Sequence, residues 1–199
     1  MQHSTDRILT TYVGSLPRSE KVLHMLLEKE AGHTVDEGSF EAQVERDLDF
    51  VLRKQHEVGV DILCDGELPR LGFSFYVKDR MSGFGGHSPR GTVTDFSKFP
   101  GYAKLKQQQA EKGDEISESA TLYDMPECQN AVKYDPDKRA ARQELRLFKD
   151  ALERTGVGRK ATQTFVTAAS PGIVSTTLLR NPDNPDYSND RDYVLALAE

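Results

Sequence analysis

The segment VDILCDGE, residues 60–67, decides the fold class. Its first half is a short apolar run bounded by Gly59 and Gly66, which is typical of a strand buried on both faces of a parallel sheet. Asp65 and Glu67 follow this strand directly. Ligands of parallel α/β proteins gather beyond the carboxyl ends of the strands, so the segment predicts both a core strand and one side of a binding site.

The same succession of strand and turn occurs twice more. Residues 8–13, ILTTYV, lead into the turn GSLPR at 14–18, and residues 162–168 lead towards Ser170-Pro171-Gly172. Helical periodicity connects these strands, over residues 19–30, about 34–58 and about 136–155. Apolar strands joined by helices predict an α/β fold with a parallel sheet, and right-handed crossovers should place the three turns at one edge.

Two parallel architectures fit this pattern: a doubly wound open sheet and a (β/α)8 TIM-type barrel. A barrel has eight strands in roughly 250 residues, whereas this chain of 199 residues shows three long core strands. The chain is therefore expected to be a small open sheet or part of a barrel. Residues 80–134, rich in Gly, Pro, Ser and charge, are interpreted as an insertion-like excursion between the second and third core strands, with strand-like pieces at 92–96 and 129–134 and a helix at 102–112.

Composition narrows the classes of partner. There are 26 basic and 32 acidic side chains, a net charge of −6 and a mean hydropathy of −0.60. An acidic chain without a Lys/Arg-rich run argues against a nucleic acid or an anionic membrane and favours small-molecule partners. The sequence shows neither an apolar run long enough to span a bilayer nor a signal-peptide core near its start, which predicts a cytoplasmic location.

Polar residues after the three strands are the candidate site. Ser15 precedes a helix, where backbone N–H groups favour a carboxylate or phosphate, although it could simply cap that helix. Glu67 could receive a substrate ammonium, or form a structural ion pair with Arg70 or Arg18. The third strand contributes Thr167 and Ser170.

Asp65 and Glu67 alternate along an expected extended segment, so they are predicted to point to opposite sides. An acid/base pair in an unrelated open α/β enzyme would instead require both carboxylates to face one pocket. Cys64 and Cys128 show no metal-site spacing, and the five histidines form neither a His-x-Cys nor an HExxH pattern. No metal site is assigned in this chain, and the spacing alone assigns no catalytic residue.

These stretches together resemble the cobalamin-independent methionine synthase family, in particular its shorter, single-barrel members. The resemblance rests on ILTTYVGSLPR (8–18), Lys54-Gln55, GVDILCDGE (59–67) with Arg70, YVKDR (76–80) and Ser170-Pro171-Gly172. It implies a (β/α)8 barrel in which zinc activates a thiol, classically homocysteine, for attack on a methyl group carried by a folate. Ser15 would hold the amino-acid carboxylate and Glu67 the ammonium; Asp65, Arg70 and Ser170 are weaker substrate-binding candidates.

The chain also departs from that pattern. Many relatives have a histidine where this chain has Tyr12, and the zinc ligands of the family belong to the second half of the barrel, beyond the stretches matched in this chain. We therefore expect an N-terminal half-barrel, spanning residues 1–199, that carries the amino-acid-binding side of a methyl- or alkyltransferase site. The alternatives are a non-catalytic fragment, a half-barrel subunit that self-associates or needs a complementary chain, and a coenzyme-M-type thiol alkyltransferase.

Overall fold

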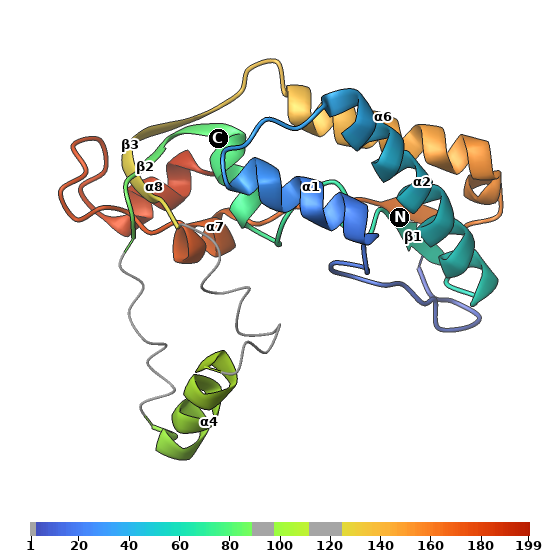
Figure 1. The fold of residues 1–199 in the computed structure, drawn as a ribbon, viewed down its shortest axis with the longest axis horizontal. Coiled ribbons are helices and arrows are strands. Elements are labelled where there is room, and N and C mark those ends of the chain that lie inside the picture. Colours follow the sequence, from blue (N-terminus) through green and yellow to red (C-terminus); the bar gives the residue numbers. More distant parts are fainter. Residues whose placement is uncertain (1–2, 89–97, 112–124) are drawn as a thin grey trace.

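Two small sheets, one parallel and one antiparallel, organise the computed structural model, which describes residues 3–88, 98–111 and 125–199. Helices α1, α2 and α6 gather around the parallel sheet at one end of an elongated molecule, and α7 and α8 lie beside the antiparallel pair at the other (Figure 1). The elements in chain order are α1 (Glu20–Glu30), α2 (Glu37–Glu57), β1 (Ile62–Cys64), η1 (Phe75–Asp79), β2 (Met81–Gly85), α4 (Pro100–Glu111), β3 (Glu127–Tyr134), α6 (Arg139–Thr155), η2 (Val157–Arg159), β4 (Gln163–Phe165), α7 (Pro171–Thr177) and α8 (Asp190–Ala196).

The strands of the parallel sheet run in the predicted direction. β1 pairs with β4 in parallel, with Ile62 opposite Gln163, and Thr11 forms a parallel bridge with Ile62. The strand predicted over residues 8–13 is nevertheless wrong, because only Thr11 pairs. The carboxylate of Asp61 accepts the backbone N–H of Thr10 at 2.8 Å and also binds the guanidinium of Arg7. Side-chain contacts thus hold the segment where a longer backbone ladder was expected.

Caps set the starts of the helices. α1 begins after Ser19, whose hydroxyl accepts the N–H of Val22, and α2 begins after Asp36 rather than the expected Thr34. α6 begins at Arg139, three residues after the start expected at about residue 136, where Asp135 and Pro136 are typical of a helix N-terminus. Asp135 instead caps a turn, because its carboxylate accepts the N–H groups of Asp137 and Arg139.

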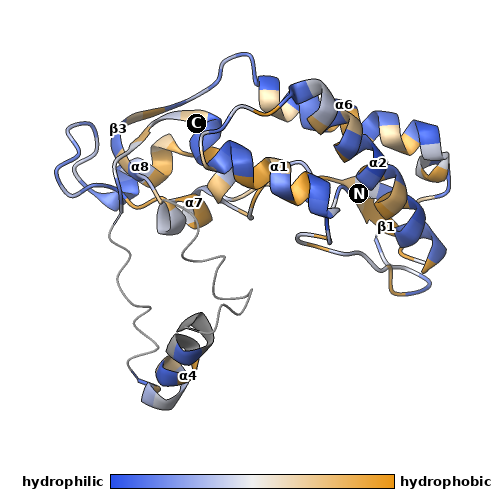
Figure 2. Cartoon of the chain, viewed as in Figure 1, coloured by the Kyte–Doolittle hydropathy of each residue, from blue (hydrophilic) through white to orange (hydrophobic). Residues whose placement is uncertain are grey.

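The main core lies between α1, α2, α6 and β1. Figure 2 shows apolar stripes on these helices beside hydrophilic outer faces, as expected for helices that cover a sheet. The sequence periodicity therefore identified the buried face of α2. In α6 the buried residues are Leu147, Phe148 and Ala151, whereas Leu145, which the periodicity also placed on the apolar face, is 43% exposed. The most deeply buried residues of this cluster are Val22, Val44, Leu48, Leu52, Leu63, Leu68, Leu147 and Ala151.

The region 80–134 contains an antiparallel β2–β3 pair and helix α4. β3 covers the strand predicted at 129–134, and α4 covers most of the helix predicted at 102–112. The strand predicted at 92–96 lies outside the described residues. α4 stands apart from the rest of the chain in Figure 1. The interpretation of this region as an insertion stays a prediction.

Candidate functional site

The GSLPR turn, residues 14–18, contacts the turn that follows β1, residues 66–69. The backbone N–H of Leu16 donates to the carbonyl oxygen of Gly66 at 2.9 Å. Gly66 has a φ of +62°, and a Cβ on it would lie 2.9 Å from the Leu16 side chain. A glycine satisfies both the left-handed backbone and the close approach. This contact carries Ser15 to the end of β1.

Glu67 lies at the centre of the site. Its carboxylate accepts hydrogen bonds from the Ser15 hydroxyl (Oε2, 2.7 Å) and from the Thr167 hydroxyl (Oε1, 2.8 Å). Glu67 is 1% exposed, whereas Ser15 is exposed and Thr167 is half-buried. The segments that follow Thr11, β1 and β4 therefore meet at one buried carboxylate, and Ser15 is its exposed partner.

The expected opposition of Asp65 and Glu67 is wrong. Residues 66–69 form a turn, and Glu67 has a φ of +56°, which is uncommon for a residue with a side chain. The N–H of Glu67 donates to Asp65 Oδ1 at 3.2 Å, and Arg70 approaches Asp65 Oδ2 at 3.9 Å while donating to Thr167. A turn replaces the extended segment, so both carboxylates lie in one polar cluster.

Arg18 binds the backbone of this turn. Its guanidinium donates to the backbone oxygens of Glu67 and Arg70, each at 2.6 Å, and to that of Leu68 at 3.1 Å. An arginine presents several donors in a fixed planar fork, which suits carbonyls converging from one tight turn. The GSLPR turn thus supplies the hydroxyl of Ser15 to the site, and its Arg18 stabilises the left-handed backbone of Glu67.

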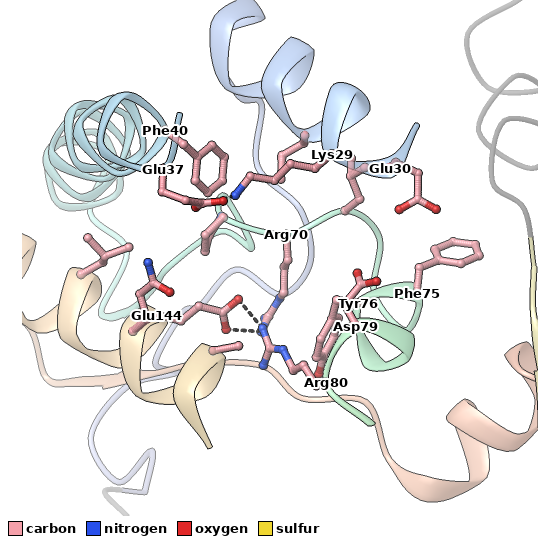
Figure 3. A pocket seen from close by; sticks show the side chains of 16 residues that line it. Lys29, Glu30, Glu37, Phe40, Arg70, Phe75, Tyr76, Asp79, Arg80 and Glu144 are labelled. Carbon is pink, nitrogen blue, oxygen red and sulfur yellow. Dashed lines mark hydrogen bonds and ion pairs between the residues drawn. The ribbon is translucent and has the colours of Figure 1, made fainter. Parts of the chain in front are cut away.

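A buried ionic cluster adjoins Glu67. Arg70, 4% exposed, pairs with Glu144 of α6 at 3.3 Å, and Glu144 also binds Arg80. The centroid of the Tyr76 ring lies 4.8 Å from the guanidinium group of Arg70 and 4.2 Å from that of Arg80. Figure 3 shows Glu144 meeting both arginines beside this ring. Burial raises the pKa of the Glu144 and Asp65 carboxyls, although the arginines oppose the shift.

Two cavities meet at this cluster. One, of about 290 Å³, lies between the N-terminal part of α6, α1, α2 and η1 (Figure 3). The other, of about 970 Å³, is bordered by Thr167, by residues 132–134 and by the end of α8. Arg70, Tyr76, Arg80 and Glu144 line both cavities. Polar groups that converge beside a roomy cavity are typical of a ligand site.

Four of the predicted site residues lie together, and Ser170 does not join them. Ser15, Asp65, Glu67 and Arg70 come together, as their positions after the strands suggested. Ser15 is not a helix cap, because Ser19 caps α1. Arg70 binds Glu144 and Thr167, and Arg18 binds the backbone of the turn. Ser170 is the N-cap of α7 and accepts the N–H of Ile173, so the structure gives it a structural role.

Two residues at or beside the site were given no role in the sequence interpretation. Glu144 lies on the apolar face of α6, four residues from both Ala140 and Phe148, so a charge within an apolar stripe was the available signal. Gln55 shows the same signal in α2; its side-chain amide exchanges two hydrogen bonds with the backbone of Cys64, at 2.9 and 3.1 Å. Buried polar side chains in such stripes require partners, and here those partners come from the strand ends.

A zinc site does not fit the residues that the structure describes. Within residues 3–88, 98–111 and 125–199, no three His, Cys, Asp or Glu side chains are grouped so that they could hold a metal ion. Burial raises the pKa of both Cys64 and Cys128, that of Cys128 to about 11, and a metal ligand is a thiolate. In the same described part of the chain, no helix is long and apolar enough to cross a bilayer.

Comparison with known proteins points to one family. Residues 8–96 match the family described as the cobalamin-independent synthase catalytic domain. A 5-methyltetrahydropteroyltriglutamate–homocysteine methyltransferase of Thermosynechococcus vestitus is 30% identical over 84 residues, which are 42% of this chain and 11% of that protein. The proteins of the same name from Actinobacillus pleuropneumoniae and Bifidobacterium animalis are 31% and 29% identical over 75 residues, each 38% of this chain and 10% of the relative.

The family match covers part of the site, and the alignments cover only part of the relatives. The matched family segment includes Ser15, Asp65, Glu67, Arg70 and Arg80, whereas Glu144 and Thr167 lie beyond it. The aligned part is about a tenth of the length of the curated relatives. The family resemblance seen in the sequence is thereby confirmed over this segment.

Proposed function

We propose that this chain, which over residues 8–96 belongs to the cobalamin-independent methionine synthase family, supplies the amino-acid-binding part of an S-methyltransferase. Its relatives are named as methyltransferases that act between a methyltetrahydropteroyl donor and homocysteine. The proposed acceptor is an amino-acid thiol of the homocysteine type, and the proposed donor is a methyl-folate. The parallel β1–β4 pair and the helices around it support a partial (β/α)8 barrel as the framework of this site.

The observation that carries the proposal is the convergence of Ser15, Glu67 and Thr167. A carboxylate has about four acceptor positions, and the two hydroxyls occupy two of them. The hydroxyl donors are neutral, so they orient the carboxylate while leaving its charge for a cationic ligand. An α-ammonium group would form a charge-assisted hydrogen bond there.

Ser15 is placed for the other end of an amino acid. Its side chain is exposed, and a hydroxyl can turn its proton from Glu67 towards an arriving carboxylate. An ammonium that reaches Glu67 would replace the bond that Ser15 gives up. The two groups of a zwitterion would thus be bound by one exposed donor and one buried acceptor.

The test is a pair of ligands that differ only in the ammonium group. We would titrate the chain with L-homocysteine and with 4-mercaptobutyrate and measure dissociation constants by NMR. Glu67→Gln should weaken L-homocysteine binding roughly 10- to 150-fold, the effect of one charge-assisted hydrogen bond, and change 4-mercaptobutyrate binding little. Ser15→Ala should cost less, because backbone N–H groups of the same turn remain.

The matched control is Glu41→Gln, which removes a carboxylate bound by Gln143 and Arg146 between α2 and α6. It should leave both affinities unchanged. Unchanged L-homocysteine affinity in Glu67→Gln would make Glu67 structural. A thiol without an ammonium, of the coenzyme M type, would then be the better substrate hypothesis.

A further inference from the structure

A continuous path of polar contacts leads from α6 to Glu67. Glu144 Oε2 lies 3.3 Å from Arg70 Nη1. Arg70 Nη2 donates to the hydroxyl of Thr167 at 2.7 Å and to its backbone oxygen at 2.9 Å. The Thr167 hydroxyl then donates to Glu67 Oε1 at 2.8 Å. Each partner in this path is buried or half-buried, so solvent competes little for these bonds.

The path has a fixed direction. A guanidinium carries donors only, so Thr167 must accept from Arg70. A hydroxyl has a single proton, and with Arg70 on its acceptor side that proton is directed at Glu67. Because Arg70 also binds the Thr167 carbonyl, both the backbone and the side chain of Thr167 are held.

The formal charges of the four ionic groups beside Glu67 balance without a ligand. Arg70 and Arg80 face Glu144 and Asp65, which gives two positive and two negative formal charges. A pair of arginines neutralised in this way is a poor site for a free anion. The ion pair of Arg70 with Glu144 and its contact with the Tyr76 ring suit Arg70 instead to hold Thr167 in one orientation.

The two carboxylate oxygens of Glu67 therefore differ in their surroundings. Oε1 accepts from the half-buried Thr167, while Oε2 accepts from the exposed Ser15. We infer that Arg70 and Thr167 are positioning residues for Glu67, with Glu144 anchoring Arg70, so that Oε2 is presented to an ammonium group at the exposed side. The inference rests on the proposed function for the identity of that ligand.

The first test needs no ligand. The carbon-13 resonance of the Glu67 side-chain carboxyl, assigned by comparison with Glu67→Gln, should move in Thr167→Val and in Arg70→Gln and return towards the original position in Thr167→Ser. Arg146→Gln, which removes an arginine paired with Glu41 and Asp150, should leave it in place. An unmoved resonance in folded Thr167→Val overturns the inference. If Arg70→Gln does not fold, the nearly isosteric Val and the conservative Ser variants at Thr167 decide the matter.

The second test measures ligand selectivity. The ratio of L-homocysteine to 4-mercaptobutyrate affinity should fall roughly 2- to 10-fold in Thr167→Val, the range of one ordinary hydrogen bond, and recover in Thr167→Ser. A role in stability alone would lower both affinities together and leave the ratio unchanged, which would also overturn the inference. If the unsubstituted chain does not distinguish the two thiols, the proposed function fails, and the carboxyl resonance alone decides whether the positioning path exists.

Discussion

Gly66 allows the first and second turns of the site to approach each other. Its φ of +62° and the 2.9 Å that would separate a Cβ on this residue from the Leu16 side chain are two separate obstacles to any substitution. Gly66→Ala should therefore lower the free energy of unfolding by about 1–2 kcal/mol for the backbone and by roughly another 1–3 kcal/mol for the contact. Chemical denaturation measures the total loss in the free energy of unfolding.

Gly59→Ala provides the matched control for this residue. Gly59 has a φ of +83°, but a Cβ there meets nothing within 4 Å. Its loss should be the backbone part alone, about 1–2 kcal/mol. Equal losses in the two variants would show that Leu16 gives way without cost and that Gly66 is needed only for its backbone angle.

At the scale of elements, Gln55 joins α2 to β1. The residue is 5% exposed, and its amide bonds both the N–H and the C=O of Cys64. Gln55→Leu keeps the volume but leaves two buried backbone groups without these partners, so we expect a loss of about 2–4 kcal/mol in the free energy of unfolding. Lys54→Leu, at an exposed neighbouring position, should change it by less than about 0.5 kcal/mol.

The link between α2 and β1 also bears on the site. Cys64 immediately precedes Asp65, so the position of β1 determines where the turn at 66–69 begins. Gln55→Leu should therefore also shift amide resonances of residues 65–70. If Gln55→Leu were as stable as the unsubstituted chain, water or a neighbouring group would have to bind the Cys64 N–H and C=O in place of the Gln55 amide.

At the scale of the whole molecule, stability should fall in alkaline solution. Burial raises the pKa of Cys128 to about 11 and also raises that of Tyr193. Unfolded cysteine loses its proton near pH 8.5, so the folded state binds more protons above that value. The stabilisation is complete below about pH 8.5 and is lost as the pH rises towards 11. Denaturation at pH 8, 9, 10 and 11 should show a shallower decline in Cys128→Val, and equal slopes would contradict the assignment.

The open parallel sheet predicts association. β4 pairs with β1 on one side, and among the described residues no further strand pairs with it. Ile8 and Val13, whose side chains are 84% and 64% exposed, flank Thr11, which pairs with Ile62 of β1. Unpaired strand edges and exposed apolar side chains favour self-association or a complementary chain. Sedimentation velocity should show concentration-dependent association, reduced in Thr164→Lys; a monomer at all concentrations would contradict this expectation.

The sequence by itself determined the local elements and the family. Apolar runs between glycines identified the segments at β1 and β4, the 3.6-residue periodicity identified α1, α2 and α6, and the turns after the strands pointed to Ser15 and Glu67. These features depend on residues close together in the chain, and a single sequence contains that information. The prediction of an extended conformation after β1 was wrong because it used local information alone. The left-handed φ of Glu67 depends on Arg18 and Leu16, which are about 50 residues away in the chain.

Only the tertiary structure decided which side chains meet. Ser15 and Thr167 reach Glu67 from 52 and 100 residues away, and Glu144 reaches Arg70 from 74 residues away. Such contacts depend on how parallel strand ends align and on how α6 packs against the turn, and no local propensity encodes either. A polar residue in an apolar stripe predicts that a buried partner exists, but the identity of that partner is fixed when distant segments pack together.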